Sequence, residues 1–237
     1  CLSTAGACYQ GVFQNPMAAP DILGASSGAA LGASLAIILG YINFTISAFA
    51  FVFSLGTVAL VIFVGNRAKG NRVVGLILAG VMISSLVSSC TSFIKLIADT
   101  EDQLPAITYW LMGSFNGADM RDIKLAAIPM LLGLIPIFAL RWRINILSLG
   151  DDEAKTLGIN AKRLRLIIIV CSAAITAASV AVSGIIGWVG LVIPHMARRV
   201  VGNDYKKLIP ATMLFGAIFM LLVDDICRNV WATDLPI

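Results

Sequence analysis

Long stretches without charged residues are the feature that most constrains this chain. Residues 22–66 hold 45 consecutive positions without Asp, Glu, Lys or Arg, and further charge-free runs cover 73–94, 125–140, 166–197 and 208–223. A helix needs roughly 20 apolar residues to cross the hydrocarbon core of a bilayer. Because a water-soluble domain could not bury this much apolar surface, the pattern predicts an all-α polytopic membrane protein.

Composition agrees with that prediction. The mean hydropathy is +0.92 and 13% of the residues are charged, against about 25% in soluble chains. The net charge of +4 therefore marks the loops on the cytoplasmic side and does not indicate a nucleic-acid partner. The five cysteines are scattered and form no CxxC motif, so we interpret them as small packing residues.

Basic residues gather in three short segments, which together hold 13 of the 17 lysines and arginines: Arg67, Lys69 and Arg72; Arg141, Arg143, Lys155, Lys162, Arg163 and Arg165; and Arg198, Arg199, Lys206 and Lys207. The remaining long loop, residues 99–122, is acidic. The positive-inside rule places the three basic segments in the cytoplasm and the acidic loop outside.

The spans follow from these positions. We expect a partial helix over about 1–14, a turn at 40–43, a short interfacial helix over 104–112, and spans near 22–40, 43–65, 73–98, 123–141, 166–186 and 208–228. The span 166–186 starts inside and must end outside, yet 198–207 is basic. The chain must therefore return through a short or broken helix around 187–195.

A similar interruption occurs near the start of the chain, at Pro16 and Pro20. Interrupted segments in corresponding places of two halves, here about 1–98 and 166–237, indicate a transporter with inverted repeats. Small residues support close helix packing: Gly24, Gly28 and Gly32 recur every four positions, and residues 172–183 are rich in Ala and Ser.

The sequence offers no energy source of its own. Ion-coupled carriers keep ionisable residues within their spans, whereas the span centres here have none, and no GxxxxGK[ST] phosphate loop is present. We therefore expect a separate ATP-hydrolysing subunit to contact the cytoplasmic segment 147–165. There, Ser148 or Asp151 would cap a short helix, Gly158 would end it, and Leu149, Ala154 and Leu157 would offer an apolar contact. The alternative is an ordinary solvated connector.

Several motifs, in order along nearly the whole chain, resemble the iron-siderophore, haem and vitamin B12 permease family (FecCD-like) of bacterial ABC importers. Glu153-Ala154-Lys155-Thr156-Leu157-Gly158 resembles the EAA-type coupling loop of ABC importer permeases. Asn15-Pro16-Met17-Ala18 with the following Pro20 and Gly24 resembles the family's NPLA-P--LG signature. The family's WLMGS, GF-GL--PH-AR and ELPIG motifs are matched from Trp110, Gly187 and Asp234.

The resemblance implies a type II importer permease fold with inverted helical repeats. Full-length members have ten helices, of which about eight would be present here in a chain truncated at both ends. It implies a single transmembrane permease domain over 1–237, with a coupling loop at about 142–165, in the cytoplasmic membrane of a bacterium or archaeon. The implied partners are a second copy of the chain, two ATP-binding subunits that hold the ATP and Mg, and an extracytoplasmic binding protein; the chain itself would bind no cofactor.

By the same resemblance, individual residues acquire roles. The coupling loop would contain Gly150, Asp152, Glu153, Ala154, Leu157 and Gly158, and the cytoplasmic gate Asn15 and Pro16. The broken-helix segment would contain Gly190, Pro194 and His195, with His195 capping it. Arg228 would dock the binding protein, the alternative being a local pair with Asp224. The expected substrate is an iron chelate, haem or cobalamin, with oxyanions also carried in the family.

Two other classes of function compete with the importer. One is an ion-coupled secondary transporter, which the lack of intramembrane carboxylates disfavours. The other is an intramembrane serine protease, because Gly24-Ala25-Ser26-Ser27-Gly28 fits GxSxG and His195 is the single histidine. That motif marks a strand-to-helix elbow in soluble hydrolases, whereas this copy lies in a Gly/Ala-rich helix.

Overall fold

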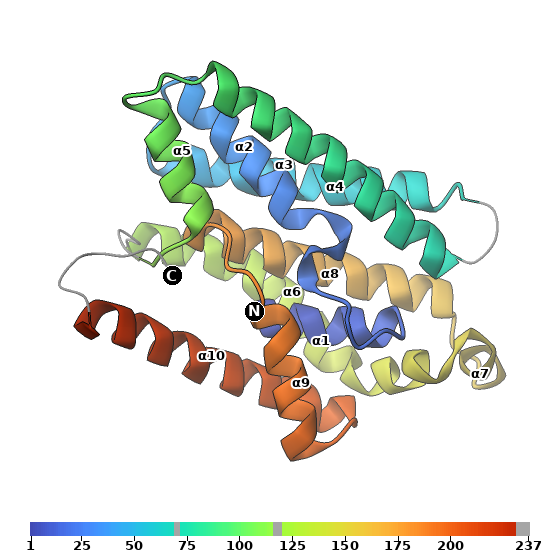
Figure 1. Ribbon diagram of the computed structural model, residues 1–237. Coiled ribbons are helices and arrows are strands. Elements are labelled where there is room, and N and C mark those ends of the chain that lie inside the picture. Colours follow the sequence, from blue (N-terminus) through green and yellow to red (C-terminus); the bar gives the residue numbers. More distant parts are fainter. Residues whose placement is uncertain (69–71, 116–119, 231–237) are drawn as a thin grey trace. The chain divides into compact units, whose positions relative to one another are not determined.

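The computed structural model describes residues 1–68, 72–115 and 120–230, and these residues form helices and no strands. The all-α prediction is confirmed. Along the chain the helices are α1 (Leu2–Val12), the 3-10 helix η1 (Pro20–Leu23), α2 (Ala25–Ile38), α3 (Phe44–Gly65), α4 (Arg72–Ile97), α5 (Gln103–Met112), α6 (Met120–Leu149), α7 (Asp151–Thr156), α8 (Ala161–Ser183), α9 (Val189–Val201) and α10 (Tyr205–Val230) (Figure 1). Lys69, Asp119 and the Asp234–Ile237 motif lie outside the described residues.

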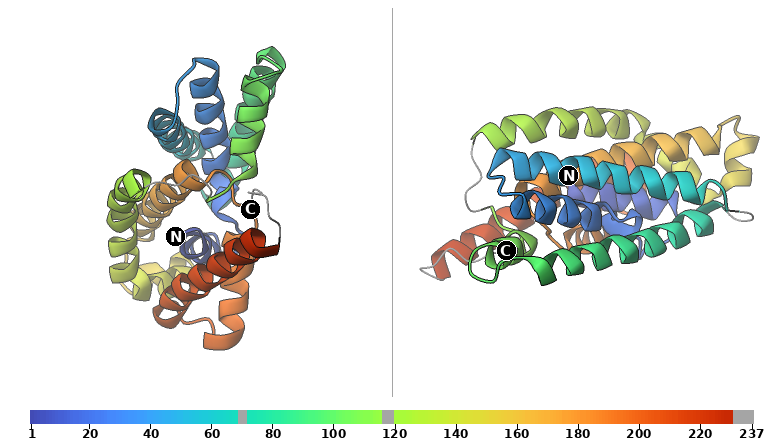
Figure 2. Two further views of the ribbon diagram at one scale, coloured as in Figure 1. Left: turned by 90° about the vertical axis from the view of Figure 1, so that its left-hand side faces the viewer. Right: turned by 90° about the horizontal axis from the view of Figure 1, so that it is seen from above.

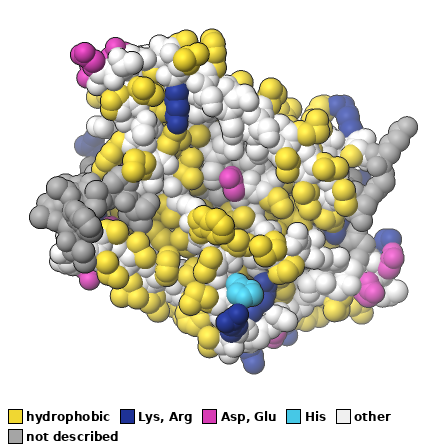
Figure 3. Space-filling model, in the orientation of Figure 1, with side chains coloured by type: hydrophobic (Ala, Val, Ile, Leu, Met, Phe, Trp, Pro, Cys, Tyr) yellow, Lys and Arg dark blue, Asp and Glu magenta, His cyan; other side chains and the backbone are white. Residues whose placement is uncertain are grey.

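Five of the described helices, α3, α4, α6, α8 and α10, are long and apolar enough to cross a membrane. The predicted span over 22–40 is not among them, because α2 has 14 residues and Gly24 (φ 75°) separates it from η1. Their surfaces are apolar as well, and Figure 3 shows hydrophobic side chains spread over much of one face with few charged ones among them. Helix α6 runs eight residues past the predicted end at Arg141. The charges at Arg141 and Arg143 end the apolar span, but they do not stop the helix from continuing into the cytoplasm.

The chain forms two compact units, and each takes segments from distant parts of the sequence. The first unit comprises residues 1–20, 127–176 and 187–225, and the second comprises 21–126, 177–186 and 226–237. In the second unit α2 packs against α3, α4 and α5. Gly28 and Gly32 lie against the backbone carbonyls of Phe53 and Phe49 on α3, which confirms the predicted small-residue face.

In the first unit the main close approach is that of α1 to α9. A side-chain Cβ at Gly6 would lie 1.7 Å from the carbonyl oxygen of Gly190, and one at Gly190 would collide with the Pro20 ring. Both positions therefore require glycine. Within this unit α7 lies at the end shared by α6 and α8, as the right-hand view of Figure 2 shows.

Candidate coupling surface and transport path

Hydrogen bonds bring three segments of the first unit together at the end of α6. The Asn145 amide donates to Asp204 (2.7 Å), and its oxygen accepts the backbone N–H of Tyr205 (2.7 Å). The Gln14 amide donates to the carbonyl of Leu147 (2.9 Å). The loop after α1, the end of α6 and the α9–α10 turn therefore meet at one end, where basic residues predicted to be cytoplasmic also lie.

The Asp204 carboxylate in this cluster is stabilised in its charged form. The Asn145 amide and the Lys206 backbone N–H donate to it, and Lys206 and Lys207 add positive charge nearby, so the pKa of Asp204 lies below its ordinary value. These hydrogen bonds to the ionised Asp204 carboxylate stabilise the turn between α9 and α10.

In the second unit, two hydrogen bonds join the ends of α5 to the ends of α2 and α8. Gln103, at the start of α5, donates to the carbonyl of Ile38 at the end of α2 (3.4 Å), and the Ser114 N–H donates to the carbonyl of Ser183 at the end of α8 (2.8 Å). The acidic loop and the end of α8 thus share one side. This agrees with the prediction that α8 runs from the cytoplasm outwards.

Helix α9 returns the chain to the cytoplasmic end. It has 13 residues, about 20 Å of helix at 1.5 Å per residue, against roughly 30 Å of hydrocarbon core. Residues 184–188 before it are not helical, and Gly202–Asp204 after it reach Asn145. The short return segment required by the charge pattern is therefore present.

The position of the break differs from the prediction. It lies at 184–188, ahead of Gly190, Pro194 and His195, which all fall inside α9. The first residue before the helix is Trp188, in a left-handed conformation (φ 66°), and no side chain caps the helix. His195 is exposed in mid-helix, so the expectation that it caps the broken segment is wrong.

The predicted coupling helix is α7, a helix of six residues between two glycines. Gly150 adopts φ 141° and Gly158 adopts φ 69°, conformations that favour glycine. The N–H of Gly158 donates to Lys155 and that of Ile159 to Ala154, which is a Schellman ending. The prediction that Gly158 ends this helix is confirmed.

The start of α7 was predicted wrongly. Gly150 is the N-cap, and no side chain caps the helix. Ser148 instead donates to the carbonyl of Asn145. The N-cap position is occupied by a glycine, which has no side chain to accept the free N–H groups of the first turn.

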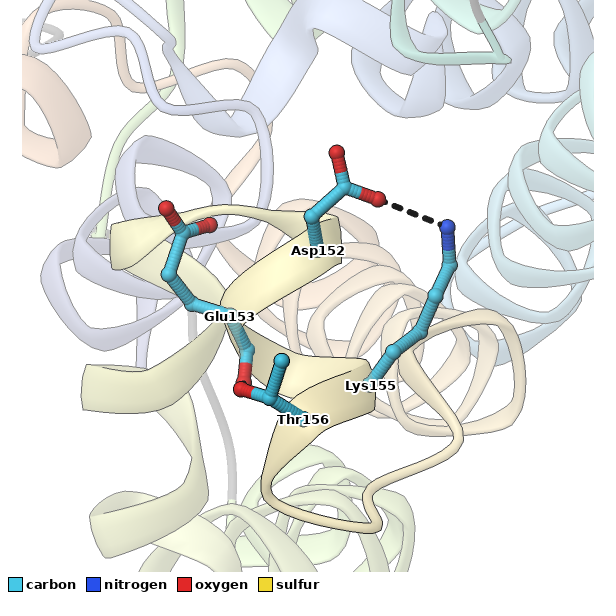
Figure 4. Close-up of polar contacts among 4 residues, drawn as sticks. All are labelled: Asp152, Glu153, Lys155 and Thr156. Carbon is cyan, nitrogen blue, oxygen red and sulfur yellow. Dashed lines mark hydrogen bonds and ion pairs between the residues drawn. The ribbon is translucent and has the colours of Figure 1, made fainter.

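The surface of α7 is mostly polar and exposed. Lys155 pairs with Asp152 at 2.8 Å, and the Thr156 hydroxyl donates to the carbonyl of Glu153 (Figure 4). Leu157 is 61% exposed, whereas Ala154 is fully buried. An exposed ion pair contributes little stability, so Asp152 and Lys155 could exchange partners at low cost. The expectation that Ala154 offers an apolar contact is wrong because its side chain is buried, and that role stays a prediction for Leu157.

The first interruption has a defined geometry. Helix α1 ends at Phe13, and Gln14 follows in the left-handed region (φ 51°), which costs a non-glycine residue roughly 1–2 kcal/mol. The Asn15 side chain accepts the backbone N–H of Met17 (2.9 Å), and Pro16 is exposed. The helix therefore stops ahead of Pro16, and Asn15 holds the turn that follows.

A group of hydrogen bonds around Arg198 connects three helices next to this turn. The Arg198 guanidinium on α9 donates to the buried Gln10 side chain on α1 and to the Tyr205 hydroxyl at the start of α10 (3.2 Å). Sequence reasoning missed this cluster, because residues 10 and 198 are 188 positions apart and no local pattern relates them.

A stripe of hydroxyl groups on α4 was also missed. Ser85, Ser88, Ser89 and Ser92 are exposed along one face of this membrane-spanning helix. Three of these hydroxyls donate to the carbonyl four residues earlier. The spacing of three and four residues was visible in the sequence, and it places these hydroxyl groups in a row along one face of α4.

The remaining predicted site residue, Arg228, lies in the last turn of α10 and is exposed. Its place at the end of a span agrees with the sequence prediction, and the docking role stays a prediction. Residues 1–68, 72–115 and 120–230 contain no group of three His, Cys, Asp or Glu side chains that could hold a metal ion.

The whole chain matches one family of known proteins. The FecCD transport family matches residues 1–237. The chain belongs to the FecCD transport family. It is 41% identical over 236 residues to the molybdate import system permease protein of Haemophilus influenzae, covering all of this chain and 70% of that protein. It is 42% identical over 238 residues to a probable iron chelatin transport system permease protein of Helicobacter pylori, covering 71% of that protein.

A solved structure extends the match to three dimensions. It is described as an inward-facing conformation of a metal-chelate type ABC transporter, with a TM-score of 0.94 and 40% identity over 99% of this chain and 75% of that one. The FecCD chain is thus an ABC transporter permease with a type II permease fold, a multi-pass protein of the cytoplasmic membrane. Membership of this family argues against the two competing classes, an ion-coupled carrier and a serine protease.

Proposed function

We propose that this chain is the permease subunit of an ATP-driven importer and forms its translocation path by alternating access. The observation that carries the proposal is α7, a short exposed helix that joins the end of α6 to the start of α8. It lies between two glycines and beside the basic residues of these two helices. A helix on a rigid base can transmit movement of a bound subunit to the spans it joins.

In this proposal α7 docks in an ATP-binding subunit, and two such subunits hold the ATP and Mg while the chain itself binds no cofactor. Asp152 and Glu153 would orient the contact, Leu157 would bury apolar surface in it, and Gly150, Ala154 and Gly158 would keep the helix in place. The Gln14 bond to Leu147 joins the α1 ending to the base of α7. Movement at α7 would therefore reach Asn15 and Pro16, which we propose as the cytoplasmic gate.

At the outer side, we propose that Arg228 pairs with a carboxylate of an extracytoplasmic binding protein. Such an exposed pair would mainly steer and orient the partner. Two copies of the chain would enclose the path, with the hydroxyl stripe of Ser85, Ser88, Ser89 and Ser92 along its wall, because exposed hydroxyls on a span suit a polar passage better than lipid.

The proposed substrate is an iron chelate, such as a ferric siderophore or haem, or cobalamin. The probable iron chelatin permease of Helicobacter pylori supports this choice. The molybdate permease of Haemophilus influenzae, which is 41% identical, favours molybdate as the second candidate.

Uptake by proteoliposomes tests the proposal. The full-length chain, its ATP-binding subunit and its binding protein would be reconstituted, and entry of labelled iron chelate and labelled molybdate would be measured. We expect uptake of one of them to require ATP and to persist with ionophores. Uptake that needs no ATP and is abolished by ionophores would overturn the proposal in favour of an ion-coupled carrier.

A further inference from the structure

The first unit has a groove at its cytoplasmic end, between the end of α6 and the start of α8. Its volume is about 650 Å³, within the range of roughly 300–1,000 Å³ of small-molecule sites. The helices line it with two arginines, a tryptophan and apolar side chains, mainly Arg143, Arg163, Trp142, Leu140, Leu164 and Ile167, and the link from α7 to α8, residues 157–160, lines it as well.

The lining changes character along the groove. Leu140 and Ile167 lie on the parts of α6 and α8 that are deeper in the membrane, and Ile167 is 45% exposed. Arg143 and Arg163 follow towards the cytoplasm, and both are exposed. Trp142, 51% exposed, lies beside them, as expected of an indole at headgroup depth.

The charge of the groove is of one sign. The described residues that line it include Arg143 and Arg163 and no Asp or Glu. On the neighbouring helix α7, Asp152 pairs with Lys155, and neither Asp152 nor Glu153 lines the groove. The groove therefore presents two guanidinium groups above apolar walls.

We propose that this groove binds an anionic phospholipid of the cytoplasmic leaflet. The headgroup phosphate would lie between Arg143 and Arg163, whose planar guanidinium groups suit phosphate oxygens, and an acyl chain would run along Leu140 and Ile167. Basic pockets between spans on the cytoplasmic side have the chemistry for such headgroups. The site requires the membrane orientation of the chain and no ATP hydrolysis. Because Leu157, which the proposed function places against the ATP-binding subunit, also lines the groove, both tests use the full-length chain without that subunit.

Quenching of Trp142 fluorescence tests the site. The full-length chain would be placed in nanodiscs of phosphatidylcholine with a minority of phosphatidylglycerol, with bromine on the acyl chains of one lipid or the other. The difference between wild type and Trp142→Phe isolates this indole. We expect brominated phosphatidylglycerol to quench Trp142 well beyond its share of the lipid, and brominated phosphatidylcholine to quench it less. Equal quenching per molecule by the two lipids would overturn the proposal.

Substitution of the arginines gives a second test. Each basic residue near an anionic headgroup contributes roughly a fivefold gain in affinity, so Arg143→Gln with Arg163→Gln should weaken phosphatidylglycerol binding about 30-fold. The matched control is Lys162→Gln with Arg199→Gln, which removes two exposed cytoplasmic charges that do not line the groove. Equal losses in the two double variants would show a general surface charge effect and would contradict the site.

Discussion

Replacing Gly6 with alanine tests the close approach of α1 to α9. The added Cβ would lie 1.7 Å from the Gly190 carbonyl oxygen, and real Cβ contacts are essentially never shorter than 3.0 Å, so the two helices must separate by at least about 1.3 Å. Both groups belong to the helix backbones, so no side chain can rotate away. Overpacking of this kind costs roughly 1–3 kcal/mol, and the Gln10–Arg198 bond across the same interface would weaken as well.

We therefore expect Gly6→Ala to lower the free energy of unfolding by at least about 2 kcal/mol, measured by equilibrium unfolding of the full-length chain in mixed detergent micelles. The matched control is Gly56→Ala on α3, where a Cβ would meet nothing within 4 Å. That variant should be neutral or more stable by up to about 1 kcal/mol. A Gly6→Ala protein as stable as the Gly56→Ala protein would refute the reasoning.

Three further predictions follow from the cytoplasmic end. The double variant Glu153→Lys with Leu157→Asp should no longer co-purify with the ATP-binding subunit or stimulate its ATP hydrolysis. The control Lys162→Gln, at an exposed residue, should do both. Undiminished stimulation by the double variant would contradict the coupling role of α7. A cysteine at Asn203 should react with an impermeant thiol reagent from the cytoplasm and one at Ala118 from outside, and labelling of 203 from outside would refute the short return through α9. Asn145→Ala should lower the thermal midpoint most above pH about 4. The lowered pKa of Asp204 means that its contribution is present above the unfolded value and lost as the pH falls through the folded value. A midpoint difference that does not change with pH would contradict that contribution.

Charge-free runs and basic clusters were sufficient to predict the five long spans, because the bilayer imposes a length and a charge asymmetry on any chain that crosses it. They did not show that the run after residue 22 forms a helix of only 14 residues. The ending at Gly158 was also predictable, since a glycine after a short amphipathic segment usually marks a left-handed cap. The start of α7 was not, because nothing in the local sequence indicates that Gly150 needs φ 141°.

Long-range contacts lay beyond sequence reasoning for a different reason. The Asn145–Asp204 bond and the Arg198–Gln10 bond join residues 59 and 188 positions apart, and they form only after the helices have packed. The left-handed conformation of Gln14 could not be predicted either, because the carbonyl that its side chain binds, that of Leu147, is 133 positions away. The serine stripe on α4, by contrast, follows a helical spacing and could have been found.

The most direct test of the account is ATP hydrolysis by the full-length chain in lipid. The chain would be co-purified with the products of its neighbouring genes, and ATP hydrolysis would be measured with and without the binding protein. We predict a stable complex whose ATPase activity rises when the loaded binding protein is added, and that protein's bound ligand would identify the substrate. A chain that copurifies with no ATP-binding subunit and transports its substrate without ATP would contradict the account.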